Sequence, residues 1–286
     1  MIDLSKLDVT TPMMKAGGKT ALTVKGASIT STSDYVYQAP AGSYYFVAPR
    51  FGAHTESVHR TRSEWKEQEG WLFNSAEEHV NRQKFNLKEV IDGRKVVVAQ
   101  AHNDEGNNPV CKVFWNDGDI VAGIRTKDVK TDPKNETVLE GFELGKPGTV
   151  TIIVTDSGLL TVEAEQDGRT GKVEKQLDSS WSNNHLVFHG GVYNQKDMDD
   201  TDKGDRSVFE LLDLLIYHGA KTTTGVEVPA SPVDTLNKLI DSAVKLSRSE
   251  MLTELNRITN LVDDSDLSDE EQKPLYQRIK DAKSKK

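Results

Sequence analysis

Cysteine is almost absent from this sequence, which holds Cys111 and no other among its 286 residues. No intramolecular disulfide can form, and no cluster of cysteines can bind a metal ion. Long apolar runs are lacking too, since none approaches the roughly 18 residues that a membrane-spanning helix needs. The segment 1–18 has an acidic third residue and no apolar core of the secretory type, so no signal peptide is visible. We therefore predict no membrane partner.

Positive charge is in the minority. The chain has 36 lysines and arginines against 45 aspartates and glutamates, which gives a formal net charge of −9. No basic block precedes the last residues, KDAKSKK. A chain this acidic is a poor nucleic-acid binder through its overall field, so we predict no nucleic-acid partner. An anionic ligand would have to be attracted by local basic residues.

Short alternating segments separated by turn residues run from about residue 20 to 218, a pattern typical of an all-β sandwich or jelly roll. Hairpins are predicted at 112–126, around Asn-Asp-Gly-Asp, and at 149–168, around Asp-Ser-Gly. The apolar segment 207–219 suits a buried strand that closes the sandwich. The segment 75–83 is predicted to form a short helix or a loop insertion.

The character of the sequence changes after Gly219. Residues 220–232 are small, Thr-rich and punctuated by proline, as in a linker. From 233 to 286 apolar residues recur at helical spacing, with a break near 247–249 and a capping box that starts at Ser268. We predict a β-jelly-roll domain over 1–219 and a helical appendage that packs on itself or on the β-domain, or that serves as an arm for self-association or docking.

Charged and polar residues share strand faces in two segments of the β-region. In HRTRSEWKEQ, alternation predicts one face with Arg60, Arg62, Glu64 and Lys66, which could also be an ordinary solvated ladder. In RKVVVAQAHND, alternation predicts that Gln100 and His102 share a face. That face would also carry Val96 and Val98, opposite the buried Val97, Ala99 and Ala101.

A third segment, LVFHGGVYNQ at 186–195, places His189, Tyr193 and Gln195 on one face of a predicted strand. Glycine inside a strand often marks a bulge or the close approach of a ligand or another backbone. We interpret Gly190 and Gly191 as leaving room for a ligand beside Tyr193. The alternative is an ordinary polar outer face.

Together, Arg62, Gln100, His102 and Tyr193 offer a cation, an amide, an imidazole and a phenol. No serine or cysteine nucleophile with a matching base accompanies them, and no pair of carboxylates is evident. This set suits β-elimination from a uronic acid polymer. Arginine and glutamine would neutralise the carboxylate while histidine or tyrosine removes the C5 proton and tyrosine protonates the departing O4. Such chemistry needs neither a metal nor a cofactor.

Three segments, in this order, resemble motifs of polysaccharide lyase family seven, the alginate lyases with a β-jelly-roll fold. Residues 62–67, RSEWKE, resemble the family's Arg-Ser/Thr-Glu-Leu-Arg-Glu, and 100–102, QAH, resemble its Gln-Ile/Val-His. Residues 187–195, VFHGGVYNQ, resemble its Tyr-Phe-Lys-Ala-Gly-x-Tyr-Asn-Gln. The likeness covers about residues 30–218.

The resemblance implies a role for each matching residue. Arg62 and Gln100 would neutralise the uronate carboxylate, His102 would be the base or a carboxylate partner, and Tyr193 the acid and also a candidate base. The implied substrate-binding residues are Glu64, which would orient Arg62, together with Lys66, His189 and Gln195.

Departures from the family pattern leave the polymer open. Ala101 replaces the branched residue that tracks the preference between guluronate and mannuronate, and His189 and Lys66 replace a lysine and an arginine. We expect an anionic polysaccharide substrate, alginate or a related glucuronan or bacterial capsule. The helical appendage lies outside the likeness. With no export signal visible, it suits a phage enzyme that acts outside the cell after lysis or on the virion.

Two other functions remain open from the sequence. A carbohydrate-binding module on the same sandwich could lack catalysis, because a fold does not fix a function. A jelly-roll glycoside hydrolase would use two carboxylates.

Overall fold

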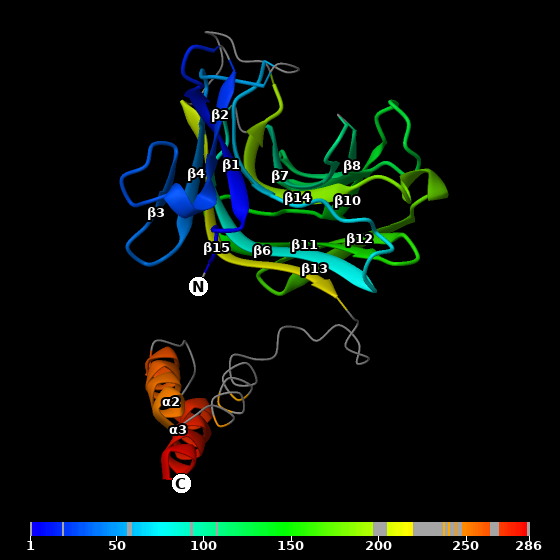
Figure 1. The fold of residues 1–286 in the computed structure, drawn as a ribbon. Helices are drawn as coiled ribbons and strands as arrows, with labels where there is room; N and C mark the ends of the chain where they lie inside the picture. Colours follow the sequence, from blue (N-terminus) through cyan, green and yellow to red (C-terminus); the bar gives the residue numbers. More distant parts are fainter. Residues whose placement is uncertain are drawn as a thin grey trace. The chain divides into compact units, whose positions relative to one another are not determined.

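Two antiparallel β-sheets stack face to face in the N-terminal part of the computed structural model (Figure 1). The structure describes residues 2–219 except 19, 56–58, 92–93, 107 and 197–204, and then residues 237, 240, 244, 248–263 and 269–284. The chain divides into two compact units, Met1–Lys221 and Thr222–Lys286. Each unit is described by itself.

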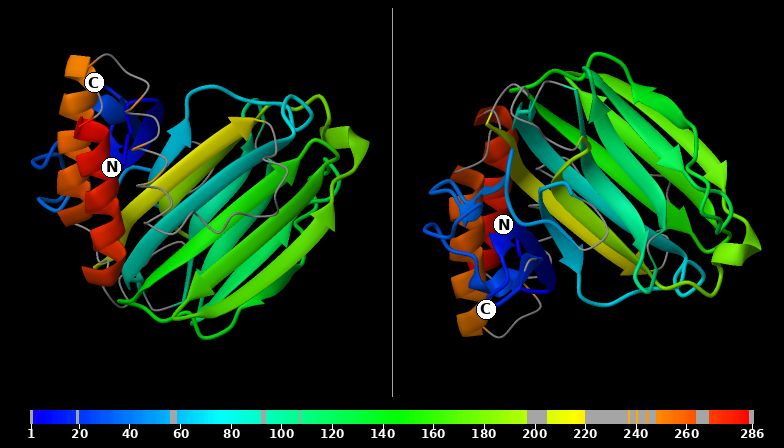
Figure 2. Two further views of the ribbon diagram at one scale, coloured as in Figure 1. Left: turned by 90° about the horizontal axis from the view of Figure 1, so that it is seen from below. Right: turned by 90° about the horizontal axis from the view of Figure 1, so that it is seen from above.

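The first sheet carries the residues that the sequence singles out. Its strands follow the order β10 (Asn135–Leu139), β9 (Asp119–Ile124), β8 (Pro109–Asn116), β7 (Lys95–Asn103), β14 (Leu186–Asn194), β5 (Arg62–Glu67), β1 (Leu7–Met14) and β2 (Ala21–Lys25). Strands distant in the sequence, such as β5 and β14, therefore become neighbours. Figure 2 shows both sheets from two further sides.

The second sheet has the order β13 (Arg169–Gln176), β12 (Leu159–Gln166), β11 (Pro147–Thr155), β6 (Glu78–Glu89), β15 (Arg206–Gly219), β4 (Tyr44–Pro49) and β3 (Val36–Gln38). The core lies between the sheets and includes the fully buried rings of Trp65, Phe85, Phe188 and Phe209. Burial of such large apolar side chains is the main stabilising contribution to a sandwich of this kind. The predicted all-β jelly-roll sandwich is thus confirmed.

Both predicted hairpins form. Asn116 pairs with Asp119 across the first turn, where Asp117 and Gly118 have φ of 50° and 96°, and two successive positive φ values are typical of a type I′ turn. In the second, β11 and β12 flank Gly158, whose φ is 80°. The segment 207–219 belongs to β15, as predicted.

The predicted helix or loop at 75–83 is wrong, because Glu78 begins the long strand β6. Its inward positions carry the buried polar side chains of His79, Asn81 and Gln83, so the sequence shows no apolar alternation there. One polar atom of each side chain has a partner inside; the Nε2 of Gln83, for example, donates to the carbonyl oxygen of Val98 at 2.8 Å. The other polar atom of each is buried without a partner among the described residues. Hydrogen bonds lower the free-energy cost of burying polar side chains. Because the inward residues are polar, the apolar alternation that would have predicted this strand is missing.

The predicted faces of β7 need one correction. Ala99 and Ala101 face the core as expected, but Val96 and Val98 also belong to the core, whereas Val97 packs with Tyr193 on the other face. The cause is a β-bulge, because β7 has one residue more than β8 between the pairs Val97↔Phe114 and Ala99↔Val113. A bulge reverses the alternation beyond it.

The two glycines of β14 have a reason other than room for a ligand. A Cβ at Gly190 would lie 2.4 Å from the Oε1 of Gln83 and 2.6 Å from the Cζ2 of Trp65, both buried. Gly191 has a φ of 121°, and its Cβ would lie 2.5 Å from the carbonyl oxygen of Ser63. Between Gly190 and Tyr193 the register with β7 shifts by one residue. The glycines therefore allow a tryptophan to pack closely and the strand to bulge.

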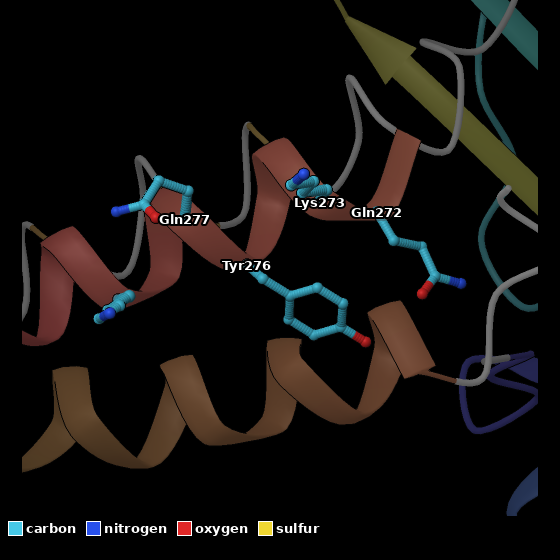
Figure 3. Close-up of a pocket in the computed structure, with 5 residues that line it drawn as sticks. Gln272, Lys273, Tyr276 and Gln277 are labelled. Carbon is cyan, nitrogen blue, oxygen red and sulfur yellow. The ribbon is translucent and has the colours of Figure 1, made fainter. Parts of the chain in front are cut away.

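The C-terminal unit contains the helices α2 (Arg248–Asp263) and α3 (Asp269–Ser284), which begin near the predicted break and just after Ser268. They pack on each other through a small core made of Ile240, Met251, Leu255, Ile258, Val262, Leu275, Ile279 and Ala282. A shallow hollow runs along α3, where Tyr276 points toward α2 (Figure 3). No described helix is long and apolar enough to cross a membrane. The linker 220–232 lies outside the described residues, and the domain boundaries stay a prediction.

Replacing Gly190 by alanine is expected to destabilise the protein by about 1–3 kcal/mol, the usual cost of overpacking a core. Its Cβ would clash with Gln83 and Trp65. Chemical denaturation measures the change. Gly18→Ala is the control, because its nearest contact is 3.6 Å and its change should stay within about 0.5 kcal/mol. Equal stabilities for both variants would contradict the packing role.

Candidate active site

The strands β5, β14 and β7 lie side by side and bring the three sequence segments onto one face of the first sheet. Their register is antiparallel: Tyr193 lies opposite Arg62, and His189 lies opposite Lys66 on one side and Gln100 on the other. Because side chains alternate along a strand, the neighbours Trp65, Phe188 and Ala101 point into the core instead.

Glu64 connects the polar side chains of this face through hydrogen bonds. Its side chain is almost completely buried, and its Oε1 accepts a hydrogen bond from the Nε2 of Gln100 at 2.7 Å. Its Oε2 accepts one from the Nη1 of Arg62 at 3.2 Å. Burial raises the pKa of Glu64, while Arg62 and the Gln100 hydrogen bond act in the opposite direction. One carboxylate therefore fixes a guanidinium and an amide from two strands.

Arg62 and Tyr193 form the next contact. The Cζ of Arg62 lies 3.7 Å from the centroid of the Tyr193 ring, within the range of a cation–π interaction. The ring of Tyr193 also packs with Val97, Phe114 and Val121 in a small apolar cluster on this face. Burial raises the pKa of Tyr193, so the phenol stays protonated at neutral pH even though Arg62 favours its anion.

His102 and His189 lie together, with their ring centroids 5.3 Å apart and their planes inclined by 19°. The Nδ1 of His102 lies 2.7 Å from the carbonyl oxygen of Asn103. A carbonyl can only accept, so Nδ1 carries the hydrogen and Nε2 keeps a free lone pair. Burial lowers the pKa of His102 to about 4 and that of His189 well below its ordinary value. Both rings are neutral at neutral pH.

The side chains described so far form a row along this face of the sheet. The remaining predicted residues, Lys66 and Gln195, lie at its two ends. The Nζ of Lys66 donates to the Oδ1 of Asp104 at 2.8 Å, next to the histidine pair. At the other end, the Nε2 of Gln195 donates to the carbonyl oxygens of Tyr193 and Asn194. The structure thus brings together all eight predicted site residues, namely Arg62, Glu64, Lys66, Gln100, His102, His189, Tyr193 and Gln195.

Sequence reasoning missed a pocket of about 260 Å³ that flanks this row. Its lining residues include Arg60, Lys95, Lys112, Phe114 and Arg125, together with Gln195. A signal was present in the sequence, since Lys112 is a lone cation in the otherwise apolar run 110–115. Its location next to Gln100, however, follows from the β7–β8 register.

The carboxylates of this face are already bound. Glu64 is held by Arg62 and Gln100, and Asp104 by Lys66, so neither is placed as a free acid with a partner base. Among the described residues, no group of three or more His, Cys, Asp and Glu side chains could hold a metal ion. The arrangement offers donors for an anion beside a neutral imidazole and a protonated phenol.

Comparison with known proteins identifies the family to which this fold belongs. A family model described as alginate lyase matches residues 2–218. An alginate lyase from Pseudomonas aeruginosa has a similar structure, with a TM-score of 0.66 and 25% identity over 76% of this chain and 100% of that one. A comparison with curated proteins finds no match.

Two further solved structures share the fold. An alginate lyase from Klebsiella pneumoniae has a TM-score of 0.66 at 19% identity, over 76% of this chain and 97% of that one. A family 7 alginate lyase in complex with its product has a TM-score of 0.62 at 23% identity, over 76% and 97%. Because the family model spans almost all of the N-terminal unit, this chain belongs to the alginate lyase family and is a polysaccharide lyase.

Proposed function

We propose that the protein cleaves alginate, or a related uronate polymer, by β-elimination at the face centred on Glu64. The observation that supports this most is that Arg62 and Gln100 are held by one buried carboxylate, beside a neutral imidazole and a protonated phenol. A uronate has a weakly acidic C5 proton next to its carboxylate, and this set supplies each group that its removal requires.

Arg62 and Gln100 neutralise the carboxylate of the reacting sugar. Glu64 uses one N–H of each, which leaves donors on both side chains for an anion. The buried Nε of Arg62 has no hydrogen-bond partner in the described part of the chain. As the C5 proton leaves, negative charge spreads into the substrate carboxylate, where charge-assisted hydrogen bonds from these donors strengthen. Glu64 is thus a positioning residue.

His102 is the base. Its Nδ1 is bound to the carbonyl oxygen of Asn103, so the lone pair of Nε2 is available for the C5 proton. His189 lies against this ring and, with Lys66 at the same end, contributes to substrate binding. The Nε2 of His189 is buried without a hydrogen-bond partner among the described residues.

Tyr193 is the acid that protonates the departing O4, because its raised pKa keeps the proton in place until it is needed. A separate base and acid suit a sugar whose C5 hydrogen and O4 lie on opposite faces of the ring. In alginate that sugar is guluronate, whereas in mannuronate the two leave from the same face. We therefore propose a preference for guluronate.

Anionic oligosaccharide is the partner for which the comparisons give support, since a family 7 relative was solved with its product and with a substrate. Self-association or virion docking through the helices, a phage origin and action outside the cell stay predictions from the sequence. Glucuronan and bacterial capsules stay alternative substrates.

Incubation with alginate should generate an unsaturated sugar that absorbs in the near ultraviolet, which hydrolysis does not produce. Tyr193→Phe should lower kcat by about 10²–10⁴-fold, because O4 loses its proton donor, while binding of oligouronate is retained. Absorbance assays and calorimetry measure both. Wild-type activity in this variant would reject the role of Tyr193. No absorbance change with alginate, glucuronan and capsules would favour a carbohydrate-binding module.

Glu64→Ala should lower kcat by about 10- to 100-fold, since Arg62 and Gln100 lose the anchor that orients them. Glu64→Gln should recover part of this loss because its amide oxygen can still accept a hydrogen bond. Glu174→Ala is the matched control, because it removes the carboxylate partner of Lys172 in the second sheet and should leave kcat unchanged. An unchanged kcat in folded Glu64→Ala would contradict the positioning role.

The acid limb of the pH profile should report His102. Burial lowers its pKa to about 4, and Lys112 of β8 with Arg62 and Lys66 of β5 act in the same direction, while the His189 ring beside it is neutral. The base is therefore deprotonated above that value. We expect kcat/KM to persist below pH 6.5 and to fall only near pH 4, with circular dichroism as the control for folding. A midpoint at 6.5 would contradict this assignment.

A further inference from the structure

Of the eleven residues that line the pocket beside the catalytic row, four are cations and one, Asp132, is an acid. Strand β8 contributes Lys112 and Phe114, β7 contributes Lys95, and Arg125 directly follows β9. Arg60 precedes β5 and Gln195 follows β14, so these two connect the pocket to the strands that carry Arg62 and Tyr193.

The pocket adjoins the catalytic phenol through two residues. Phe114 lines the pocket and packs in the same apolar cluster as Tyr193, while Gln195 lies two residues beyond Tyr193. Lys112 lies directly opposite Gln100 in the β7–β8 register. A sugar polymer that reacts between Gln100 and Tyr193 would therefore reach this pocket with an adjacent residue.

Lys95 and Lys112 have no carboxylate within ion-pair distance among the described residues. The Nζ of Lys95 instead lies 4.0 Å from the centroid of the Phe114 ring. Among the acids, Glu64 has the strongest electrostatic effect on Lys112, and Glu64 is already bound by Arg62 and Gln100. Burial lowers the pKa of both lysines, and Arg60 lowers that of Lys95 further. Partly buried cations of this kind carry an uncompensated desolvation cost.

Arg125 differs from the two lysines. Its guanidinium donates to the carbonyl oxygens of Pro109 and Thr131 and to the carboxylate of Asp132. These bonds fix Arg125 as part of the pocket wall. Asp132, the acid of the pocket, is paired with Arg125, and it acts on Lys112 without forming an ion pair with it. The two lysines are the pocket cations that differ from Arg125 in this respect.

We propose that this pocket binds the carboxylate of the uronate residue next to the one that reacts, with Lys95 and Lys112 as its ligands and Gln195 at its edge. The proposal rests on the proposed function, and it makes recognition depend on two successive carboxylates. An incoming carboxylate would supply the missing counter-charge and form charge-assisted hydrogen bonds with both lysines. The volume of about 260 Å³, at the small end for ligand sites, suits one sugar unit.

Lys95→Gln and Lys112→Gln test the proposal, with Lys172→Gln as the matched control. Lys172 is an exposed lysine of β13 in the second sheet and pairs with Glu174. On sodium alginate, each pocket variant should raise KM by about tenfold with a smaller change in kcat, and the dependence of KM on salt should become weaker. The control should match the wild type in both respects.

Stability separates binding from a structural role. Removal of an unpaired, partly buried charge should leave the melting temperature unchanged or raise it, whereas loss of a structural lysine would lower it. Unchanged KM in both pocket variants would overturn the proposal, as would a lowered melting temperature without a change in KM.

Direct binding keeps the proposal distinct from the proposed function. Calorimetry in the Tyr193→Phe background, with oligoguluronate and its methyl ester as probes, should show about tenfold weaker binding of the free acid for each pocket variant and no change for the neutral ester. Equal losses for both probes would overturn the carboxylate pocket. If the wild type cleaves no uronate polymer but this pattern holds, the proposed function fails and the pocket stands.

Discussion

A buried carboxylate organises this enzyme. Glu64 lies on β5 and reaches across β14 toward β7, and its two oxygens hold the amide of Gln100 and the guanidinium of Arg62. A carboxylate in such a position is costly unless it is hydrogen-bonded, and its two partners require it in turn to stay oriented. Arg62 then lies over the ring of Tyr193, which extends the constraint to the phenol. The buried carboxyl group of Glu64 thus fixes the positions of the side chains in the catalytic row.

Much of this face could be predicted from the sequence, because its residues follow the period of two along three strands. Arg62, Glu64 and Lys66 alternate with Trp65 and Glu67, and His189 and Tyr193 alternate with core residues of β14. The fold was predictable for the same reason. What the residues alone could not supply was the pairing of β5 with β14 and of β14 with β7, which depends on strands far apart in the chain. The family resemblance supplied that information.

Besides the role of Gly190 and Gly191, sequence reasoning fell short at three places, each for a local physical reason. The strand β6 was missed because His79, Asn81 and Gln83 face inward, where an apolar pattern is expected. Val96 and Val98 were assigned to the wrong face because a bulge, which no residue type announces, reverses the alternation in β7. The lysine pocket escaped notice because Lys95 and Lys112 meet only through strand pairing.

The contact between Gly190 and Trp65 has a consequence for how this enzyme can diverge. Trp65 fills the space on the core side of Gly190, three residues before Tyr193. The distance of β14 from the core is therefore determined by packing in the interior. A substitution in the core at either position would displace Tyr193, the proposed proton donor, without altering any group that we propose contacts the polymer. Selection for turnover should therefore also preserve Trp65, although this buried side chain does not contact the substrate.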